Sequence, residues 1–308
     1  GNSLIATQVV ARLGAALDTQ VPVRWLFSYP TVDELAERID HALSAGDDFD
    51  RDAALRAVVP ISRGNGNSLP LFCIHPMVGL AWCYGGLVQG LDDVPVYGLQ
   101  TPSILEHDFT PESIEKVALR YASEIRQVQP LGPYRVLGWS LGGVLAHAVA
   151  AQLQSEGLTV ESLVMLDAVL EIPDESAFHD EIRKSLRILG IDIRDDEKLS
   201  LTSERACELL EAVQGSAISL TVDRVQSLFT NAIEGPEMIR GYTPPTYEGD
   251  VLFFSAALDR ETNGDLTKTW AQYVDGDIHE HPIDVTHGDM MTPESLESIG
   301  PLLRRHIG

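Results

Sequence analysis

Short apolar runs alternate with amphipathic stretches along most of the chain after residue 58. The runs contain many β-branched and aromatic side chains, which predicts strands, and they cover residues 71–75, 94–99, 134–138, 163–167, 251–255 and 278–283. Residues 111–129 and 141–156 instead repeat apolar side chains at the spacing of a helix. Because apolar strands that alternate with helices form mainly parallel sheets covered on both faces, the pattern predicts an α/β fold.

The interval 170–245 interrupts this alternation. It contains helical patterns at residues 180–189, 203–213 and 221–233, and no strand is predicted before Val251. An insertion of this length between two strands is typical of a helical lid over an active site.

The first 50 residues have a different pattern. Residues 4–17 repeat apolar side chains at helical spacing, and a second helix is predicted from Thr31 to about Leu43. Thr31 and Glu34 have the spacing of a capping box, in which each side chain bonds the backbone of the other. Residues 44–52 are polar and acidic, which favours a linker. We therefore predict a small all-helical module over residues 1–45, a linker over 46–57 and an α/β domain over 58–308.

The composition of the chain argues against several classes of protein, among them nucleic-acid-binding, metal-binding and membrane-spanning ones. The 308 residues include 46 acidic and 22 basic side chains, a net charge of −24. This excess argues against a nucleic-acid partner, which requires clustered Lys and Arg. The 3 cysteines are an odd number and no pair has C-x-x-C spacing, so neither a disulfide framework nor a zinc site is indicated. No run approaches the ~18 apolar residues of a membrane span, and no secretion signal is visible, so we expect a soluble, cytoplasmic protein without metal.

The sequence GWSLGG at residues 138–143 carries the strongest chemical signal. It follows a predicted strand and precedes a predicted helix, and that context is typical of a nucleophile elbow, where small residues around a serine permit a tight turn. The alternative is a glycine-rich turn whose serine only caps the helix. We favour Ser140 as a nucleophile.

A serine needs a base, and in this fold the order along the chain is nucleophile, acid, histidine. His287 lies in the loop after the last predicted strand and is the best-placed base. Other histidines are expected in packing, on the surface or in a loop hydrogen bond: His75, His147, His279 and His281. Asp167 and Asp259 each follow a strand, and spacing alone leaves both open as the acid.

An oxyanion hole requires two backbone N–H groups aimed at the developing charge. Leu141 follows the nucleophile and would supply one of them, and Met77, in the loop after an early strand, would supply the other. Trp82 and Tyr84 lie just beyond that loop, where they would line an acyl pocket or pack in the core.

Several further stretches combine with the elbow into one resemblance. They are GNSL at residues 1–4, LFSYPTV at 26–32, PLFCIHP at 70–76, GYTPPTYEG at 241–249, and His287 with Met290 and Met291. Together they resemble the carrier–thioesterase terminus of nonribosomal peptide synthetases, over nearly the whole chain.

The resemblance implies an α/β-hydrolase fold with a helical lid, preceded by the C-terminal part of a small all-α carrier domain. It favours Asp167 as the acid, because the family places that residue 27 positions after the serine, as here. It also implies that Ser3 carries 4′-phosphopantetheine. Without the resemblance, Ser3 would be interpreted as a helix N-cap.

The implied function is a chain-releasing thioesterase. An acyl or peptidyl chain would pass from the carrier thioester to Ser140 and leave by macrocyclisation or hydrolysis, with family habit slightly favouring cyclisation. Expected partners are upstream synthetase modules in the same chain and a phosphopantetheinyl transferase. Three alternatives remain: an editing thioesterase, which a fused carrier disfavours, a non-catalytic carrier-docking domain, and an unrelated esterase.

Overall fold

The computed structural model describes residues 31–45, 55–65, 68–91, 93–106, 109, 112–170, 221–260 and 264–307, and isolated positions between 9 and 29. Ser3, most of the predicted linker and the predicted lid helices at 180–189 and 203–213 lie outside the described residues.

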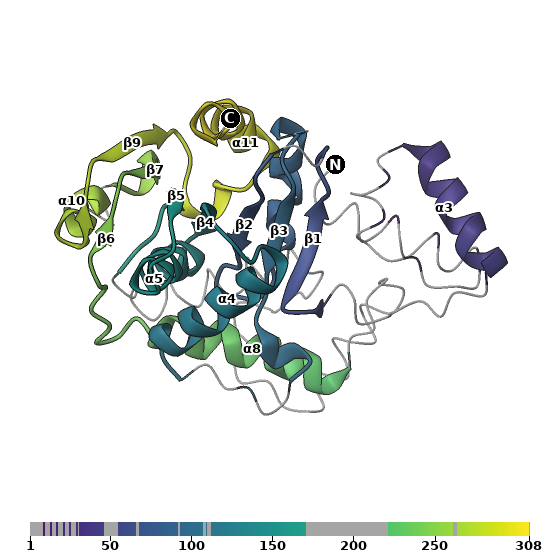
Figure 1. Ribbon diagram of the computed structural model, residues 1–308, viewed down its shortest axis with the longest axis horizontal. Helices are drawn as coiled ribbons and strands as arrows, with labels where there is room; N and C mark the ends of the chain where they lie inside the picture. Colours follow the sequence, from purple (N-terminus) through teal and green to yellow (C-terminus); the bar gives the residue numbers. More distant parts are fainter. Residues whose placement is uncertain are drawn as a thin grey trace.

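A seven-stranded sheet forms the centre of the molecule, in the order β1-β3-β2-β4-β5-β7-β9 (Figure 1). All neighbouring pairs are parallel except β1 with β3. The strands are β1 (Val58–Ser62), β2 (Leu71–Ile74), β3 (Val96–Leu99), β4 (Tyr134–Trp139), β5 (Val160–Leu166), β7 (Val251–Ala256) and β9 (Ile278–Ile283). The six predicted strands are therefore confirmed, and with them the mainly parallel α/β architecture.

Strand β1 was not predicted. It is an edge strand that alternates half-buried with buried residues and includes Pro60. A proline cannot donate to the sheet and is tolerated at such an edge, so β1 lacks the continuous apolar run of its neighbours. A second sheet pairs β6 (Tyr247–Glu248) with β8 (Val274–Asp275). The expectation of no strand before Val251 was thus wrong, because a two-residue strand is too short to produce a pattern.

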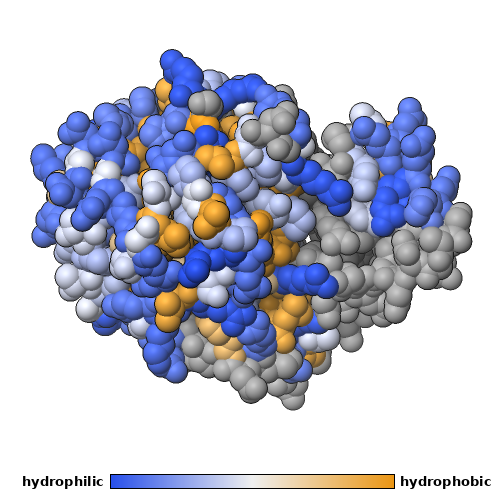
Figure 2. Space-filling view, in the orientation of Figure 1, coloured by the Kyte–Doolittle hydropathy of each residue, from blue (hydrophilic) through white to orange (hydrophobic). Residues whose placement is uncertain are grey.

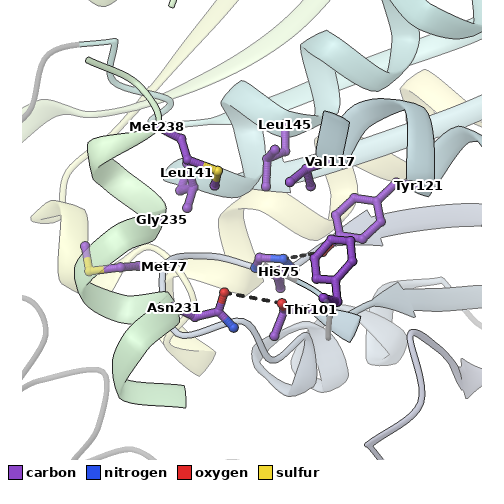
Figure 3. Close-up of a pocket in the computed structure, with 11 residues that line it drawn as sticks. His75, Met77, Thr101, Val117, Tyr121, Leu141, Leu145, Asn231, Gly235 and Met238 are labelled. Atoms are coloured by element: carbon purple, nitrogen blue, oxygen red, sulfur yellow. Dashed lines mark hydrogen bonds between the residues drawn. The ribbon is translucent and has the colours of Figure 1, made fainter. Parts of the chain in front are cut away.

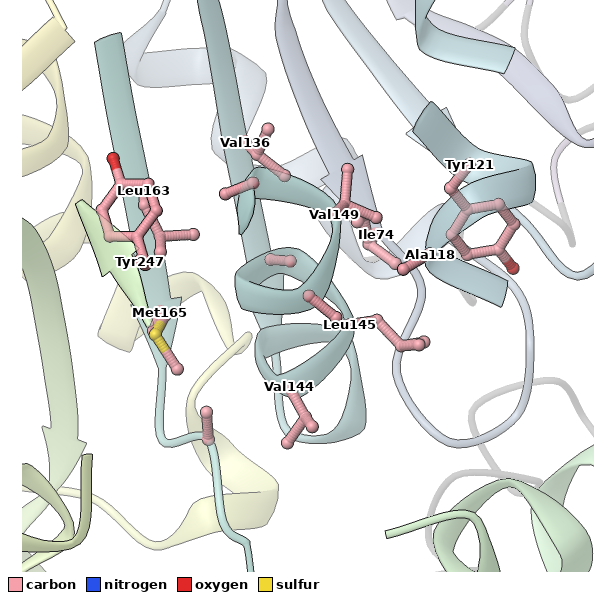
Figure 4. Packing of buried hydrophobic residues seen from close by; sticks show 14 of the residues in the cluster. Ile74, Ala118, Tyr121, Val136, Val144, Leu145, Val149, Leu163, Met165 and Tyr247 are labelled. Atoms are coloured by element: carbon pink, nitrogen blue, oxygen red, sulfur yellow. The ribbon is translucent and has the colours of Figure 1, made fainter. Parts of the chain in front are cut away.

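Helices cover both faces of the sheet. Alternate residues of β2 show the division, since Phe72 packs with α4 (Ile114–Val128) and α5 (Leu141–Ser155), whereas Leu71 packs on the opposite face with α11 (Pro293–Ile307). Figure 1 shows the strands between these two layers, and Figure 4 shows α5 side chains packed against β4, β5 and α4. The helices expected at 111–129 and 141–156 are α4 and α5. Neither α11 nor the 3-10 segment η2 (Trp82–Gly90) was predicted.

Two further helices correspond to predictions outside this core. Helix α3 (Val32–Ala45) begins after Thr31, whose hydroxyl accepts from Glu34 N–H at 3.3 Å while Glu34 Oε2 accepts from Thr31 N–H at 3.2 Å. The capping box is therefore confirmed, and Figure 1 shows α3 apart from the sheet. Helix α8 (Val222–Glu237) corresponds to the helical pattern predicted at 221–233 within the lid interval.

The outer surface is predominantly hydrophilic in the view of Figure 2, with hydrophobic groups in small separate patches. The continuous apolar surface lies instead on the two faces of the sheet, beneath the helices. No helix among the described residues is long and apolar enough to cross a membrane.

Candidate active site

Ser140 occupies a strained turn between β4 and α5. Its φ of 58° and ψ of −129° are unusual for a residue with a side chain, and its hydroxyl makes no capping bond to α5. A Cβ atom on Gly138 would overlap the Gly142 carbonyl, and one on Gly142 would overlap the Ile74 carbonyl. The glycines are therefore required for this close approach, and the resulting strain is typical of functional turns.

Ser140, His287 and Asp167 form a continuous hydrogen-bonded chain. His287 lies in the 3-10 turn η6 (His287–Asp289) after β9, and Asp167 directly follows β5. The imidazole Nδ1 is 2.7 Å from Asp167 Oδ2, and Nε2 is 2.9 Å from Ser140 Oγ. Because an ionised carboxylate only accepts, Nδ1 carries the hydrogen and Nε2 is left to accept the serine proton.

The two candidate acids have different contacts with His287. Asp167 is 1% exposed, and its second oxygen accepts from Ala256 N–H at 2.8 Å, which holds the carboxylate toward the ring. Asp259, at the end of the 3-10 turn η4 (Ala257–Asp259), accepts from the backbone N–H of His287 through Oδ2. Asp167 therefore contacts the imidazole ring of His287, whereas Asp259 bonds the backbone of the loop that carries His287.

The turn containing Asp167 is held by neighbouring elements. Asp167 has a φ of 43° and donates its backbone N–H to Phe254 O at 2.7 Å. The next carbonyl, that of Ala168, accepts from Trp270 Nε1 at 2.8 Å, and Trp270 is completely buried. These bonds hold a left-handed backbone that a residue with a side chain seldom adopts.

One expected oxyanion donor, Leu141, begins α5, and the other, Met77, lies in the turn after β2. Leu141 is the first residue of α5, so its N–H has no acceptor within the helix. Met77 lies in the turn after β2, and among the described residues no acceptor is recorded for its N–H. The amino end of α5 also carries partial positive charge, which favours an anion at this position. The arrangement is suited to a developing oxyanion.

A cavity beside the elbow is bounded by α4, α5, α8 and the loops after β2 and β3 (Figure 3). Its lining is mostly apolar and includes both oxyanion candidates: His75, Met77, Thr101, Phe109, Val117, Tyr121, Leu141, Leu145, Asn231, Gly235 and Met238. Asn231 connects α8 to the loop after β3, because its Oδ1 accepts from Thr101 Oγ1 at 3.3 Å. Sequence reasoning missed these two residues, although Thr101 follows an apolar run and thus lies at the edge that holds Ser140.

The remaining candidates have other roles. Tyr84 is buried in the core, where it donates to Ile74 O and accepts from Trp139 N–H, and neither it nor Trp82 lines this cavity. His147 packs as expected, with its ring 4.8 Å from that of Trp270, and burial lowers its pKa to about 4. His279 and His281 are on β9, at the sheet edge. No cluster of three or more His, Cys, Asp or Glu suited to a metal occurs in the described part of the chain.

Comparison with known proteins identifies the family of this chain. Residues 69–304 match the thioesterase domain family, and residues 1–39 match the phosphopantetheine attachment site. The chain thus belongs to the thioesterase domain family and carries a phosphopantetheine attachment domain at its N-terminus. Its relatives include nonribosomal peptide synthetases, as the resemblance implied.

Two relatives illustrate the match. A dimodular nonribosomal peptide synthase of Bacillus subtilis (strain 168) is 36% identical over 98% of this chain. Enterobactin synthase component F of Escherichia coli (strain K12) is 28% identical over 99% of it. This chain spans only 13% and 22% of those two proteins, respectively.

Solved structures show the same fold. The NocB thioesterase domain, in covalent complex with a fluorophosphonate nocardicin G analog, is 25% identical with a TM-score of 0.58, covering 79% of this chain and 96% of that one. A four-domain nonribosomal peptide synthetase bound to AMP and glycine is 23% identical with a TM-score of 0.69, covering 99% of this chain and 24% of that one.

The boundaries at residues 45 and 57 and the attachment at Ser3 stay predictions.

Proposed function

We propose that this chain is the chain-releasing thioesterase of a nonribosomal peptide synthetase and that Ser140, His287 and Asp167 are its catalytic triad. The observation that carries the proposal is the unbroken hydrogen-bonded path from Ser140 Oγ through the His287 ring to Asp167. It lies at the carboxyl edge of a parallel sheet in a thioesterase-family chain.

The first half-reaction acylates Ser140. His287 Nε2 removes the hydroxyl proton as Oγ attacks the thioester carbonyl carbon, and the Met77 and Leu141 N–H groups stabilise the oxyanion. The carbon–sulfur bond then breaks, and His287 transfers its proton to the leaving thiolate. Asp167 stabilises the imidazolium that exists between these two transfers. The products are an acyl ester on Ser140 and a free thiol.

The second half-reaction releases the acyl group. His287 takes a proton from water, or from an amine or hydroxyl of the acyl chain, as that nucleophile attacks the ester carbonyl. The bond to Ser140 breaks, and the serine recovers its proton from His287. Water gives a free acid and an internal nucleophile gives a macrocycle. The same side chains serve both outcomes. The shape of the cavity beside the elbow therefore governs whether water or an internal nucleophile reaches the ester.

Ser3 is the proposed attachment residue for 4′-phosphopantetheine. When bound, this group supplies the thiol that carries the acyl chain as a thioester. The support comes from the GNSL motif and from the family match over residues 1–39. A phosphopantetheinyl transferase would install the group, and upstream modules would supply the chain.

The first test is the intact-protein mass after exposure to a fluorophosphonate probe. We expect one adduct on the wild-type chain and none on Ser140→Ala or His287→Ala, because phosphonylation requires a serine activated by its histidine. Ser155→Ala is the matched control, since Ser155 Oγ only donates to Gln152 O at the far end of α5. It should label like wild type.

Two results would contradict the proposal. Labelling that persists in Ser140→Ala would place the reactive serine elsewhere. An absence of labelling in wild type, together with no turnover of acyl thioesters, would instead favour a non-catalytic carrier-docking domain.

A further inference from the structure

His75 is a buried histidine that the proposed acyl transfer does not use. It follows β2, is 5% exposed and forms part of the cavity wall. Both of its ring nitrogens have partners: Nδ1 is 2.7 Å from Pro76 O, and Nε2 is 2.5 Å from the Tyr121 hydroxyl on α4. The contact with Tyr121 is visible in Figure 3.

These partners determine where the hydrogen of the ring lies. A carbonyl only accepts, so Nδ1–H donates to Pro76 O, and Nε2 accepts from the Tyr121 O–H. Burial lowers the pKa of His75 to about 4, so the ring is neutral near pH 7 and has a single N–H. The Pro76 carbonyl therefore selects the tautomer in which that hydrogen is on Nδ1, and the buried Tyr121 hydroxyl donates to Nε2.

The bond to Pro76 O also fixes the direction of the Met77 N–H, which belongs to the same peptide group. The Pro76–Met77 peptide is trans, so its C=O and its N–H point in opposite directions. The carbonyl is held by two donors, His75 Nδ1–H and the backbone N–H of Gly79 at 3.0 Å. Holding the oxygen in place fixes the direction of the Met77 N–H, away from the His75 ring.

Rotation of this peptide group would reverse its dipole. The Met77 N–H would then leave its position, and a carbonyl oxygen would approach the place of the proposed oxyanion, which it would repel. The elbow is close enough for this to matter, because a Cβ atom on Gly142 would contact the His75 carbonyl at 2.7 Å. The orientation of this one peptide therefore decides whether two donors or one face the substrate.

We propose that His75, whose ring is held on its other side by the Tyr121 hydroxyl, positions the oxyanion hole by holding the Pro76–Met77 peptide with the Met77 N–H toward the substrate. This inference rests on the proposed function, because it takes Met77 as an oxyanion donor. His75 is a positioning residue, since it acts through the backbone and not on the reacting atoms.

The test uses steady-state kinetics of the full chain with a short apolar acyl thioester of N-acetylcysteamine. Removal of one oxyanion donor costs about 100- to 1,000-fold in kcat. Gly79 still holds the carbonyl in His75→Leu, so we expect a smaller loss of about 10- to 100-fold in kcat with KM within about 2-fold. Tyr121→Phe keeps the His75 ring and removes only the hydroxyl, so it should lower kcat less, and again without raising KM.

Two replacements of His75 separate positioning from simple packing. The amide nitrogen of His75→Asn can occupy the place of Nδ1 and donate to Pro76 O, whereas that of His75→Gln lies nearer the place of Nε2. We expect Asn to recover most of the kcat lost in His75→Leu and Gln to recover little. Tyr134→Phe is the control for Tyr121→Phe, since the Tyr134 hydroxyl donates to backbone carbonyls at residues 129 and 130, at the other end of β4.

A second readout isolates the oxyanion. An acyl trifluoromethyl ketone forms a tetrahedral oxyanion on the serine, whereas the corresponding thioether cannot. In His75→Leu we expect affinity for the ketone to fall by the same factor as kcat/KM and affinity for the thioether to remain within about 2-fold. If His75→Leu does not fold, the Asn, Gln and Tyr121→Phe variants decide the question.

Wild-type kcat in His75→Leu, equal losses in the Asn and Gln variants, or a parallel loss of affinity for both inhibitors would each overturn the positioning role. These results differ from failure of the proposed function, in which the wild-type chain itself neither forms the phosphonyl adduct nor turns over thioesters.

Discussion

At the scale of single residues, His287 is held by two aspartates with separate tasks. Asp167 contacts the ring through Nδ1, and Asp259 contacts the backbone of the same residue. Sequence reasoning considered both as the acid, because each follows a parallel strand. Only their contacts distinguish the carboxylate that bonds the imidazole ring from the one that bonds the backbone of the loop.

The two aspartates should respond differently to the same conservative change. Asp167→Asn removes the charge opposite the imidazolium and permits the wrong tautomer, so kcat should fall by about 10⁴-fold. In Asp259→Asn the amide oxygen still accepts from His287 N–H. Even complete loss of one ordinary hydrogen bond costs only about 1 kcal/mol, so kcat should remain within about 10-fold of wild type.

Steady-state kinetics on an acyl thioester measure both variants directly. Equal losses in the two would show that Asp259 contributes charge to the triad and would contradict the division of tasks.

At the scale of elements, the elbow depends on how closely α5 approaches β2. Gly142 lies where any side chain would meet the Ile74 and His75 carbonyls. Gly142→Ala therefore forces α5 outward, which displaces Ser140 and Leu141 together. We expect a loss of at least about 100-fold in kcat, since a displacement of about 1 Å in a catalytic group has that effect.

Gly157 provides the matched control for Gly142→Ala. It has a φ of 78° and open space around its missing side chain, just beyond the end of α5. Gly157→Ala should lower the free energy of unfolding by about 1 kcal/mol through backbone strain and leave kcat unchanged. Kinetics and urea unfolding of both variants test the contrast, which fails if Gly142→Ala retains wild-type turnover.

At the scale of the whole molecule, two buried histidines connect stability to pH. Burial lowers the pKa of both His75 and His147 to about 4, against 6.5 for an ordinary histidine. The unfolded chain therefore binds more protons than the folded chain between pH 4 and 6.5. By linkage, the free energy of unfolding decreases as the pH falls through this window.

The expected slope approaches about 1.4 kcal/mol per pH unit for each histidine. Urea unfolding at pH 7 and at pH 4.5 measures the loss in wild type. His147→Gln should show a smaller loss between the two pH values, because it has one fewer group to protonate. An unchanged pH dependence in that variant would contradict a neutral, buried His147.

The sequence by itself determined much of the architecture, because local physical rules act on short segments. Apolar runs separated by helical patterns indicated a parallel sheet, the spacing of Thr31 and Glu34 indicated a capping box, and glycines around Ser140 indicated a tight elbow. Each inference depends on residues within a few positions of one another. Strand β1 and helix α11 were not predicted, since each contains a proline (Pro60 and Pro301), a residue that disfavours the interior of a strand or a helix.

Only the tertiary structure decided how distant residues meet. His287 lies 120 residues beyond Asp167 and 147 beyond Ser140, yet all three side chains share hydrogen bonds at one edge of the sheet. The parallel topology brings the strand ends to that edge, but loop conformation selects which aspartate faces the ring. The contact between His75 and Tyr121, 46 positions apart, likewise arises from α4 packing over β2. Such contacts depend on the positions of whole elements in space, which no local pattern specifies.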